Sequence, residues 1–296
     1  MNLHLAIIFV LLAGTAWASS GIAVQSFFQH SDRTPIELTN IRMILSSILI
    51  FIVAWRYGGI RKNFRILNRW RRLWIELVIY GIIGIMLMQY TYFAAIKFGS
   101  AASVTVITYV YPAMVICWTS FAHRKIPPAG EILAVILAIV GVFLLVTEGD
   151  PSKLSVSIEC LILSVASGAC FAFASIYPKR LFALFDPYFL TAIGMFIGGI
   201  ATFPFLPDLN WFEFFKPDVI FYTLWIIFIG TTIAFIFFNA GLKYLSPEIA
   251  SVSATIEPVA SVVISYFVFG TTFGSIALIG IFLVILAIVS PVLIRK

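Results

Sequence analysis

One carboxylate lies near the middle of a long apolar stretch in the C-terminal part of this chain. Glu257 precedes Pro258, and Ser253 and Ser261 stand about one helical turn before and after it, on the same helical face. An ionisable side chain at membrane depth is costly enough to indicate a functional site. Glu257 is therefore our candidate substrate contact and proton carrier. The alternative is that Glu257 is protonated or hydrogen-bonded to its neighbours and only shapes the helix.

Two prolines follow polar side chains inside apolar stretches, in Tyr111-Pro112 and Glu257-Pro258. A proline in a helix removes one backbone hydrogen bond and frees a carbonyl one turn earlier, which bends the helix and exposes polar backbone. We therefore expect Pro112 and Pro258 to act as hinges or to present ligand contacts.

The remaining candidates for a substrate cavity are polar or aromatic residues of other apolar stretches. They are Trp17, Gln89, Tyr92, Thr108, Tyr111, Phe171, Thr231 and Phe235, with Ser253 and Glu257. An aromatic cavity with few charges favours zwitterionic or amphipathic molecules over multiply charged anions. Packing explains each aromatic residue taken singly, because 16% of the chain is aromatic. We expect Arg42, one turn from the membrane boundary, to reach back to water beside Glu37.

Enzymatic chemistry has no visible basis in this sequence. The three histidines fall at the ends of apolar stretches or between them, and the three cysteines lie inside such stretches without paired or metal-type spacing. No phosphate-binding loop or zinc-protease motif occurs. We expect no metal, no cofactor and no ATP-driven pumping, so that transport would be secondary.

The elements that must position these residues are membrane-spanning helices. The chain has 296 residues, 61% of them hydrophobic and 11% charged, with a mean hydropathy of +1.07. Since a transmembrane helix needs about 20 apolar residues, the sequence predicts an all-α membrane protein rather than soluble domains. The ten predicted spans are 4–24, 36–55, 73–96, 100–121, 130–147, 157–177, 188–206, 219–242, 248–269 and 275–294.

Basic residues indicate the orientation of these spans. Fourteen Lys and Arg residues fall in the connections on one side and four in those on the other. Because basic loops stay in the cytoplasm, both termini are predicted to be cytoplasmic, in a cell inner or plasma membrane. This topology also explains the net charge of +6 without a nucleic-acid partner. Residues 59–72 are expected to form an amphipathic helix anchored on anionic headgroups.

The sequence contains an internal repeat. Residues 94–114 align with 240–260 at a constant shift of 146, with identities at Ala94/Ala240, Lys97/Lys243, Ser100/Ser246, Val106/Val252 and Pro112/Pro258. Each half, 1–150 and 151–296, then holds five spans of one integral membrane domain. An odd number of crossings makes the second half enter from the opposite side, which predicts two inverted five-helix repeats. The alternative is coincidental matching in apolar sequence.

The residues also resemble a known family. The carriers of the resemblance are Trp17, Pro35 with Arg42, Ala95-Ile96-Lys97, Tyr111-Pro112 and Ile256-Glu257-Pro258-Val259. In order, spacing and duplication they are similar to the drug/metabolite transporter superfamily and its EamA-type ten-helix members. The resemblance implies efflux. The chain departs from the family where the fourth and ninth helices usually end in Gly-Glu, because it has His123-Arg124-Lys125 and Gly270-Thr271-Thr272 there.

The sequence thus predicts a secondary carrier of small organic metabolites that works by alternating access. Its expected partners are a small-molecule substrate, membrane lipid and a candidate coupling proton, and its oligomeric state stays open. The rival interpretations are a membrane scaffold or assembly protein with a degenerate cavity and, behind it, an intramembrane enzyme.

Overall fold

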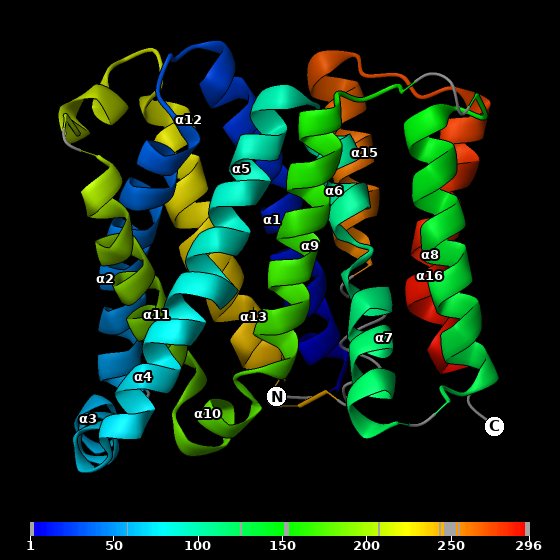
Figure 1. The fold of residues 1–296 in the computed structure, drawn as a ribbon. Helices are drawn as coiled ribbons and strands as arrows, with labels where there is room; N and C mark the ends of the chain where they lie inside the picture. Colours follow the sequence, from blue (N-terminus) through cyan, green and yellow to red (C-terminus); the bar gives the residue numbers. More distant parts are fainter. Residues whose placement is uncertain are drawn as a thin grey trace.

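A computed structural model gives the fold of this chain, and it describes residues 3–57, 59–124, 126–150, 154–206, 208–242, 244–245, 253 and 255–293. These residues form a bundle of long helices that run from one end of the molecule to the other (Figure 1). Within the described residues every regular element is helical, which confirms the all-α prediction.

The first half begins with two long helices, α1 (Leu3–Gln29) and α2 (Pro35–Tyr57), which are followed by the short α3 (Ile60–Arg69). Its third span is continuous from α4 (Arg71–Ile79) through the π-helix η1 (Tyr80–Leu87) to α5 (Met88–Phe98). Its fourth span is α6 (Ala101–Thr108) with α7 (Tyr111–His123), and its fifth is α8 (Ala129–Thr147).

The second half repeats this order. It begins with α9 (Ile158–Ile176), the short α10 (Lys179–Leu184) and α11 (Pro187–Thr202), followed by the 3₁₀ turns η2 (Phe203–Phe205) and η3 (Trp211–Phe215). Its third span runs through α12 (Ile220–Leu224), the π-helix η4 (Trp225–Ile233) and α13 (Ala234–Leu242). The last described helices are α15 (Ile256–Phe269) and α16 (Ser275–Leu293).

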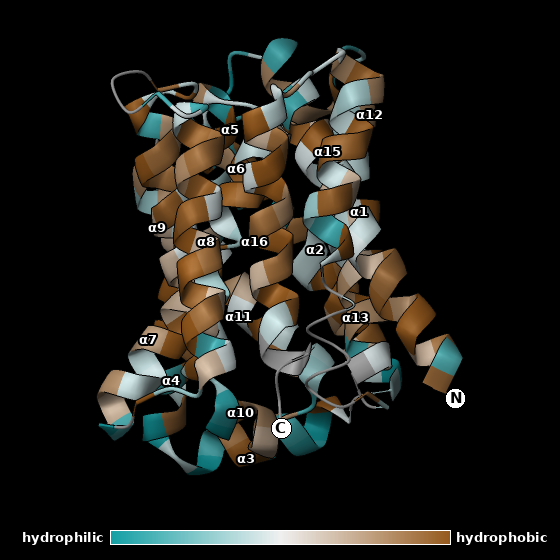
Figure 2. Cartoon of the chain, turned by 90° about the vertical axis from the view of Figure 1, so that its right-hand side faces the viewer, coloured by the Kyte–Doolittle hydropathy of each residue, from teal (hydrophilic) through white to brown (hydrophobic). Residues whose placement is uncertain are grey.

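The helices have the length and composition of membrane spans. Within the described residues, 8 helices are long and apolar enough to cross a membrane, and the shorter apolar helices 256–269 and 275–290 occupy the places of the predicted ninth and tenth spans. Figure 2 shows hydrophobic residues along the helices and hydrophilic residues mainly at the two ends of the bundle. The chain is therefore a multi-pass membrane protein of the predicted fold class.

The two halves are inverted copies of one another. In Figure 1, α1 starts from the end that holds the N-terminus, whereas α9 starts from the opposite end. The π-helices η1 and η4 occupy the third span of each half, and their last residues, Leu87 and Ile233, are separated by the shift of 146 seen in the sequence repeat. A π-helix is rare and often marks a functional site, so its duplication supports the repeat strongly.

Glycines allow the closest helix contacts. An added Cβ on Gly141 of α8 would lie 2.7 Å from the Gly280 carbonyl oxygen of α16, and one on Gly199 of α11 would lie 2.6 Å from Ile44 Cδ1 of α2. Buried Asn40 of α2 reinforces the second contact, because its amide donates to Gly199 O at 3.1 Å and to Thr202 Oγ1 at 2.8 Å. Small residues and interhelical hydrogen bonds replace the hydrophobic effect as the cause of helix association in lipid.

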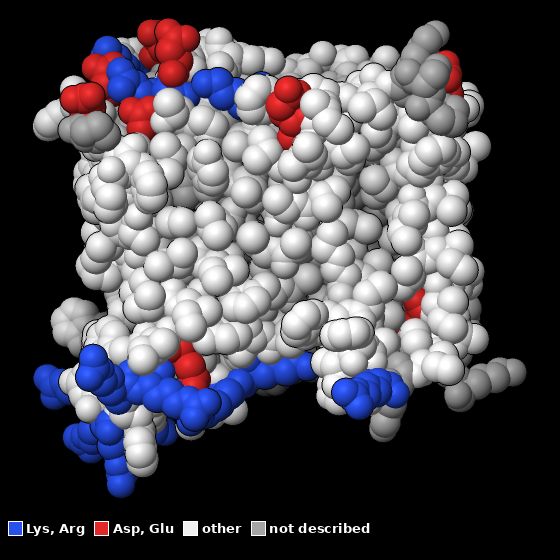
Figure 3. All heavy atoms as spheres, in the orientation of Figure 1, with Lys and Arg blue, Asp and Glu red and all other residues white. Residues whose placement is uncertain are grey.

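Charge separates the two ends of the bundle. Lys and Arg gather along the end where both termini lie, and mixed acidic and basic groups lie at the other end (Figure 3). At the mixed end, Glu213 contacts Lys216 at 2.6 Å and Arg33 at 3.5 Å. The hydrogen bond from Lys216 lowers the pKa of the Glu213 carboxyl below its usual range.

The amphipathic segment after α2 forms the predicted helix α3, but its apolar face does not lie on lipid. Leu67 is fully buried, and the rings of Phe64 and Phe189 of α11 are 5.1 Å apart in an edge-to-face contact. The expected anchoring in headgroups is wrong for this face, because α11 offers an apolar surface that the sequence pattern of α3 alone does not reveal. The basic residues of α3 remain exposed, and Ile60 at its start is partly exposed.

Candidate functional site

The centre of the candidate site lies beside α1. An added Cβ on Gly14 would clash with Ile256 Cγ2, next to Glu257, and one on Gly21 would lie 2.8 Å from Tyr92 Oη. These glycines let α15 and α5 approach α1 more closely than any larger residue would allow. The fold thereby brings the first span, the third and the ninth to one place.

Glu257 is bound to a residue of the other repeat. The hydroxyl of Tyr109 donates a hydrogen bond of 2.8 Å to Glu257 Oε2. Tyr109 is 4% exposed, and Glu257 as a whole residue is half-buried. When the carboxyl is ionised, the charge on the acceptor strengthens this hydrogen bond.

Both partners lie where a span is interrupted. The fourth span breaks at Tyr109 and Val110, between α6 and α7, and Thr255 precedes the start of α15. Pro112 and Pro258 therefore occupy the first turns of α7 and α15, where a missing backbone N–H costs no helical hydrogen bond. We expected both prolines to bend continuous helices. Pro112 instead follows a break in the fourth span, and Pro258 lies in the first turn of α15.

A second group of hydroxyls joins the two repeats beside this bond. Tyr92 Oη lies 2.7 Å from Thr105 Oγ1, and Ser261 Oγ donates to the same Thr105 oxygen at 3.3 Å. Tyr92, Glu257 and Arg42 interact electrostatically. The predicted residues Tyr92 and Glu257 therefore belong to one polar cluster.

Arg42 corrects an expectation. Its side chain is only 7% exposed and does not reach back to water; Nε donates to Thr231 Oγ1 at 2.6 Å and Nη2 to the Gly230 carbonyl at 3.4 Å. Its guanidinium carbon lies 4.9 Å from the centre of the Phe93 ring. Glu37 is instead bonded to Arg33 and Thr34. The π-helix η4 supplies both oxygen acceptors, which is why Arg42 is stable inside the bundle.

The predicted aromatic residues form two groups. Tyr111 stacks on Phe171 with ring centres 4.1 Å apart, and its ring lies 5.6 Å from that of Tyr109. Trp17 packs 5.4 Å from Phe235 and 5.0 Å from Phe238. The first group adjoins the carboxylate through Tyr109, and the second connects α1 with α13.

The other predicted site residues have mixed roles. Thr108 Oγ1 donates to the Ser164 carbonyl at 3.4 Å and so holds α6 to α9. Gln89 is 4% exposed, and its Oε1 has no hydrogen-bond partner among the described residues. Ser253 is 7% exposed. Ala250 and Ala254, which we expected to share its face with Glu257, lie outside the described residues.

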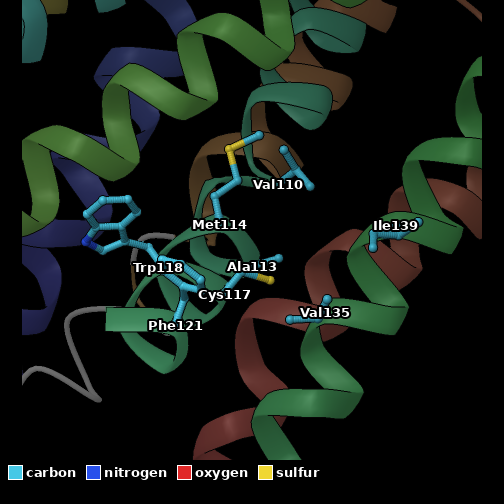
Figure 4. Close-up of a pocket in the computed structure, with 8 residues that line it drawn as sticks. All are labelled: Val110, Ala113, Met114, Cys117, Trp118, Phe121, Val135 and Ile139. Carbon is cyan, nitrogen blue, oxygen red and sulfur yellow. The ribbon is translucent and has the colours of Figure 1, made fainter. Parts of the chain in front are cut away.

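One apolar groove of the molecule does not coincide with these residues. A groove of about 490 Å³ lies between α7 and α8, and Figure 4 shows the side chains that line it. All of them are apolar or weakly polar: Val110, Ala113, Met114, Cys117, Trp118, Phe121, Val135 and Ile139. We therefore place the polar site at Glu257 and treat this groove as a surface for hydrocarbon.

The sequence pattern left two functional residues out. Tyr109 lies two positions before Tyr111, inside the aligned stretch 94–114, but no feature of the repeat distinguishes it from its neighbours. Arg42 was assigned to the surface by its distance from the span boundary alone. Among the described residues no group of three His, Cys, Asp or Glu side chains could hold a metal ion.

One family of known proteins matches this chain in two successive segments. The sequence profile of the EamA-like transporter family matches residues 4–147 and again residues 158–292. The two matches follow the two structural repeats.

Individual relatives are transporters by name. The chain is 27% identical over 280 residues to an uncharacterized inner membrane transporter, YicL, of Salmonella typhimurium, covering 95% of this chain and 92% of that protein. It is 25% identical to an uncharacterized transporter, YwfM, of Bacillus subtilis, covering 95% and 91%. A solved crystal structure with 15% identity superposes with a TM-score of 0.65 over 97% of this chain and 96% of that one, which shows the fold alone.

Proposed function

Because the chain belongs to the EamA-like transporter family and is thus a membrane transporter rather than an enzyme, we propose that it carries small zwitterionic or amphipathic organic molecules by alternating access. Amino acids are the simplest compounds of this class. The proposed direction is efflux, with both termini in the cytoplasm. The orientation rests on the basic end of the bundle, where the termini lie (Figure 3).

The observation that carries this proposal is the hydrogen bond between Tyr109 and Glu257. It joins the interruption of the fourth span to the start of α15. A ligand that competes with Tyr109 for Glu257 would weaken this hydrogen bond. Binding would thereby be coupled to a movement of one repeat, 1–150, against the other, 151–296, with Pro112 and Pro258 as hinges.

The chemistry of the cluster favours a molecule that carries one positive and one negative charge. Glu257 offers a carboxylate to a substrate ammonium group, and Arg42 places a guanidinium in the same electrostatic cluster for a substrate carboxylate. The stacked pair Tyr111–Phe171 and the ring of Trp17 offer apolar faces to a side chain. Gln89 Oε1 adds an acceptor that no described residue occupies. One formal cation is too few for a multiply charged phosphate ester.

The same carboxylate is the proposed proton carrier. Substrate and proton would then exclude one another at Glu257, because a protonated carboxyl no longer attracts an ammonium group. Such competition is sufficient for proton-driven exchange without a nucleotide-hydrolysing domain.

Thermal unfolding of the purified protein in detergent tests the proposal. The panel comprises amino acids, amines, nucleosides and drug-like cations, with the Glu257→Gln variant measured in parallel. A ligand at 100 times its Kd stabilises the folded state by about 2.7 kcal/mol, which is enough to raise the unfolding temperature. We expect an amino-acid-like compound to stabilise the wild type and not Glu257→Gln.

Two controls make this measurement decisive. Thr119→Ala removes a hydroxyl whose hydrogen bonds, among the described residues, go to carbonyl groups of its own helix, so it should keep the wild-type response. The variants Pro112→Ala and Pro258→Ala should keep ligand binding and lose most transport into proteoliposomes. A stable protein that responds to no member of the panel would contradict the proposed substrate class and favour a scaffold role.

A further inference from the structure

A second groove lies on the outer side of α2, near the basic end of the bundle. It has a volume of about 440 Å³ and is lined by Ile48, Phe51, Ile52, Trp55 and Ile60. Ile52 is 56% exposed and Trp55 is 73% exposed. From Ile48 to Trp55 the groove follows α2 for about 10 Å at 1.5 Å per residue. It therefore offers the outer part of a bilayer leaflet an apolar channel that runs along a helix.

Cations adjoin the end of this groove. Arg56 follows the lining residue Trp55, and its guanidinium carbon lies 5.1 Å from the Tyr57 ring centre. Ile60 begins α3, and exposed Arg61, Lys62, Arg65 and Arg69 follow it on the helical face opposite to Phe64 and Leu67. In Figure 3 the densest group of Lys and Arg occupies the corner where Figure 1 shows α3.

The protein holds α3 in a fixed position. Leu67 is fully buried, Phe64 contacts Phe189, and Asn63 Oδ1 accepts a hydrogen bond of 3.2 Å from the Asp186 backbone N–H. The basic face is thus preorganised, in contrast to a flexible basic loop. Preorganised groups lose less conformational freedom when they bind a ligand.

Among the described residues, no recorded ion pair neutralises these cations. In the described part of the chain, the ion pairs recorded at this end join Glu76 to Arg72 at 3.0 Å and to Arg180 at 2.8 Å. Neither involves Arg61, Lys62, Arg65 or Arg69. An exposed array of cations beside a membrane attracts anionic lipid, at about 1 kcal/mol per basic residue near the surface.

We propose that this groove and the basic face of α3 form a binding site for one anionic phospholipid. An acyl chain lies along Ile48, Ile52 and Trp55, and the phosphate is bound by Arg56 and Arg61, with Arg65 one helical turn further along. The chemistry selects phosphatidylglycerol-type headgroups over zwitterionic phosphatidylcholine, because the second carries a choline cation that the arginines repel. This site is independent of the transport proposal.

Thermal unfolding in mixed micelles provides the test. The purified protein is titrated with phosphatidylglycerol, with phosphatidylcholine of the same acyl chains, and with glycerol phosphate, which carries the anion without chains. For the wild type we expect phosphatidylglycerol to raise the unfolding temperature at least about twice as much as phosphatidylcholine, and glycerol phosphate to have little effect. High salt should reduce the difference between the two lipids.

Variants separate the two parts of the site. Arg61→Gln with Arg65→Gln should remove the preference for phosphatidylglycerol. Ile52→Trp fills the groove from an exposed position, so it should reduce the stabilisation by both lipids. The matched control, Arg124→Gln with Lys179→Gln, removes two cations from the same end of the bundle and should keep the preference. Equal stabilisation by both lipids in the wild type overturns the proposal. So does a preference that survives Arg61→Gln with Arg65→Gln, or full stabilisation by glycerol phosphate alone. If a variant fails to fold, the salt dependence in the wild type decides alone.

Discussion

Tyr109 and Glu257, 148 residues apart in sequence, are joined by a hydrogen bond of 2.8 Å. Each belongs to a different repeat and lies where its span begins a new helix. A bond at that place holds the two repeats in the observed arrangement, because each partner is attached to a short helix rather than to a continuous span. The first prediction concerns its strength.

Replacing Tyr109 by Phe should destabilise the protein by about 1.5–3 kcal/mol, the usual range for a hydrogen bond to a charged group. Glu257→Gln should cost less, since its amide oxygen still accepts from the tyrosine. In a Glu257→Leu background, Tyr109→Phe should have little further effect. Thermal or denaturant unfolding of the four proteins measures this coupling. Additive losses would show that the two side chains do not interact.

Arg42 and Thr231 form another connection between the repeats, at 2.6 Å. Thr231→Val keeps the shape of the side chain and removes the acceptor of Arg42 Nε, so it should destabilise by about 1–3 kcal/mol. Arg42→Lys should lose both donors to η4 and also reduce ligand binding. Thr223→Val is the matched control, since buried Thr223 Oγ1 has no hydrogen-bond partner among the described residues. If Thr231→Val and Thr223→Val lowered the free energy of unfolding equally, Thr231 would not have the assigned role as acceptor for Arg42.

The ends of α7 and α15 explain part of the departure from the Gly-Glu pattern. Both helices end on a residue in the left-handed conformation, Arg124 with φ of 51° and Gly270 with φ of 65°. Glycine adopts this conformation without the penalty of about 1–2 kcal/mol that other residues carry. Arg124→Gly should therefore stabilise the protein by up to about 1 kcal/mol, and Gly270→Ala should destabilise it by a similar amount. Unfolding temperatures of both variants check the opposite signs.

The proposed orientation predicts a labelling pattern. Ile126 is 90% exposed in the connection between α7 and α8 at the basic end, and Phe212 is 84% exposed at the other end. After replacement of the three natural cysteines, Phe212→Cys should react with an impermeant thiol reagent in intact cells, and Ile126→Cys only after permeabilisation. The reverse pattern would place both termini outside.

Composition and periodicity were sufficient for the class of fold. Apolar stretches of the right length, a constant shift of 146 between 94–114 and 240–260, and an odd number of spans per half lead to inverted repeats without any coordinates. Glu257 could be selected in the same way, because a carboxylate among apolar residues stands out in any span. These features are local in the chain, which is why a sequence can reveal them.

The partners of these residues were decided by tertiary structure alone. Lipid tails are as apolar as leucine, so hydrophobic periodicity does not tell which face of a span meets protein and which meets lipid. Arg42 was therefore assigned to water although η4 accepts its hydrogen bonds, and the apolar face of α3 to headgroups although Phe189 covers it. The sequence determined that this is an inverted-repeat membrane protein with one central carboxylate. The packing of distant spans decided that Tyr109 binds this carboxylate and that Arg42 is buried against η4.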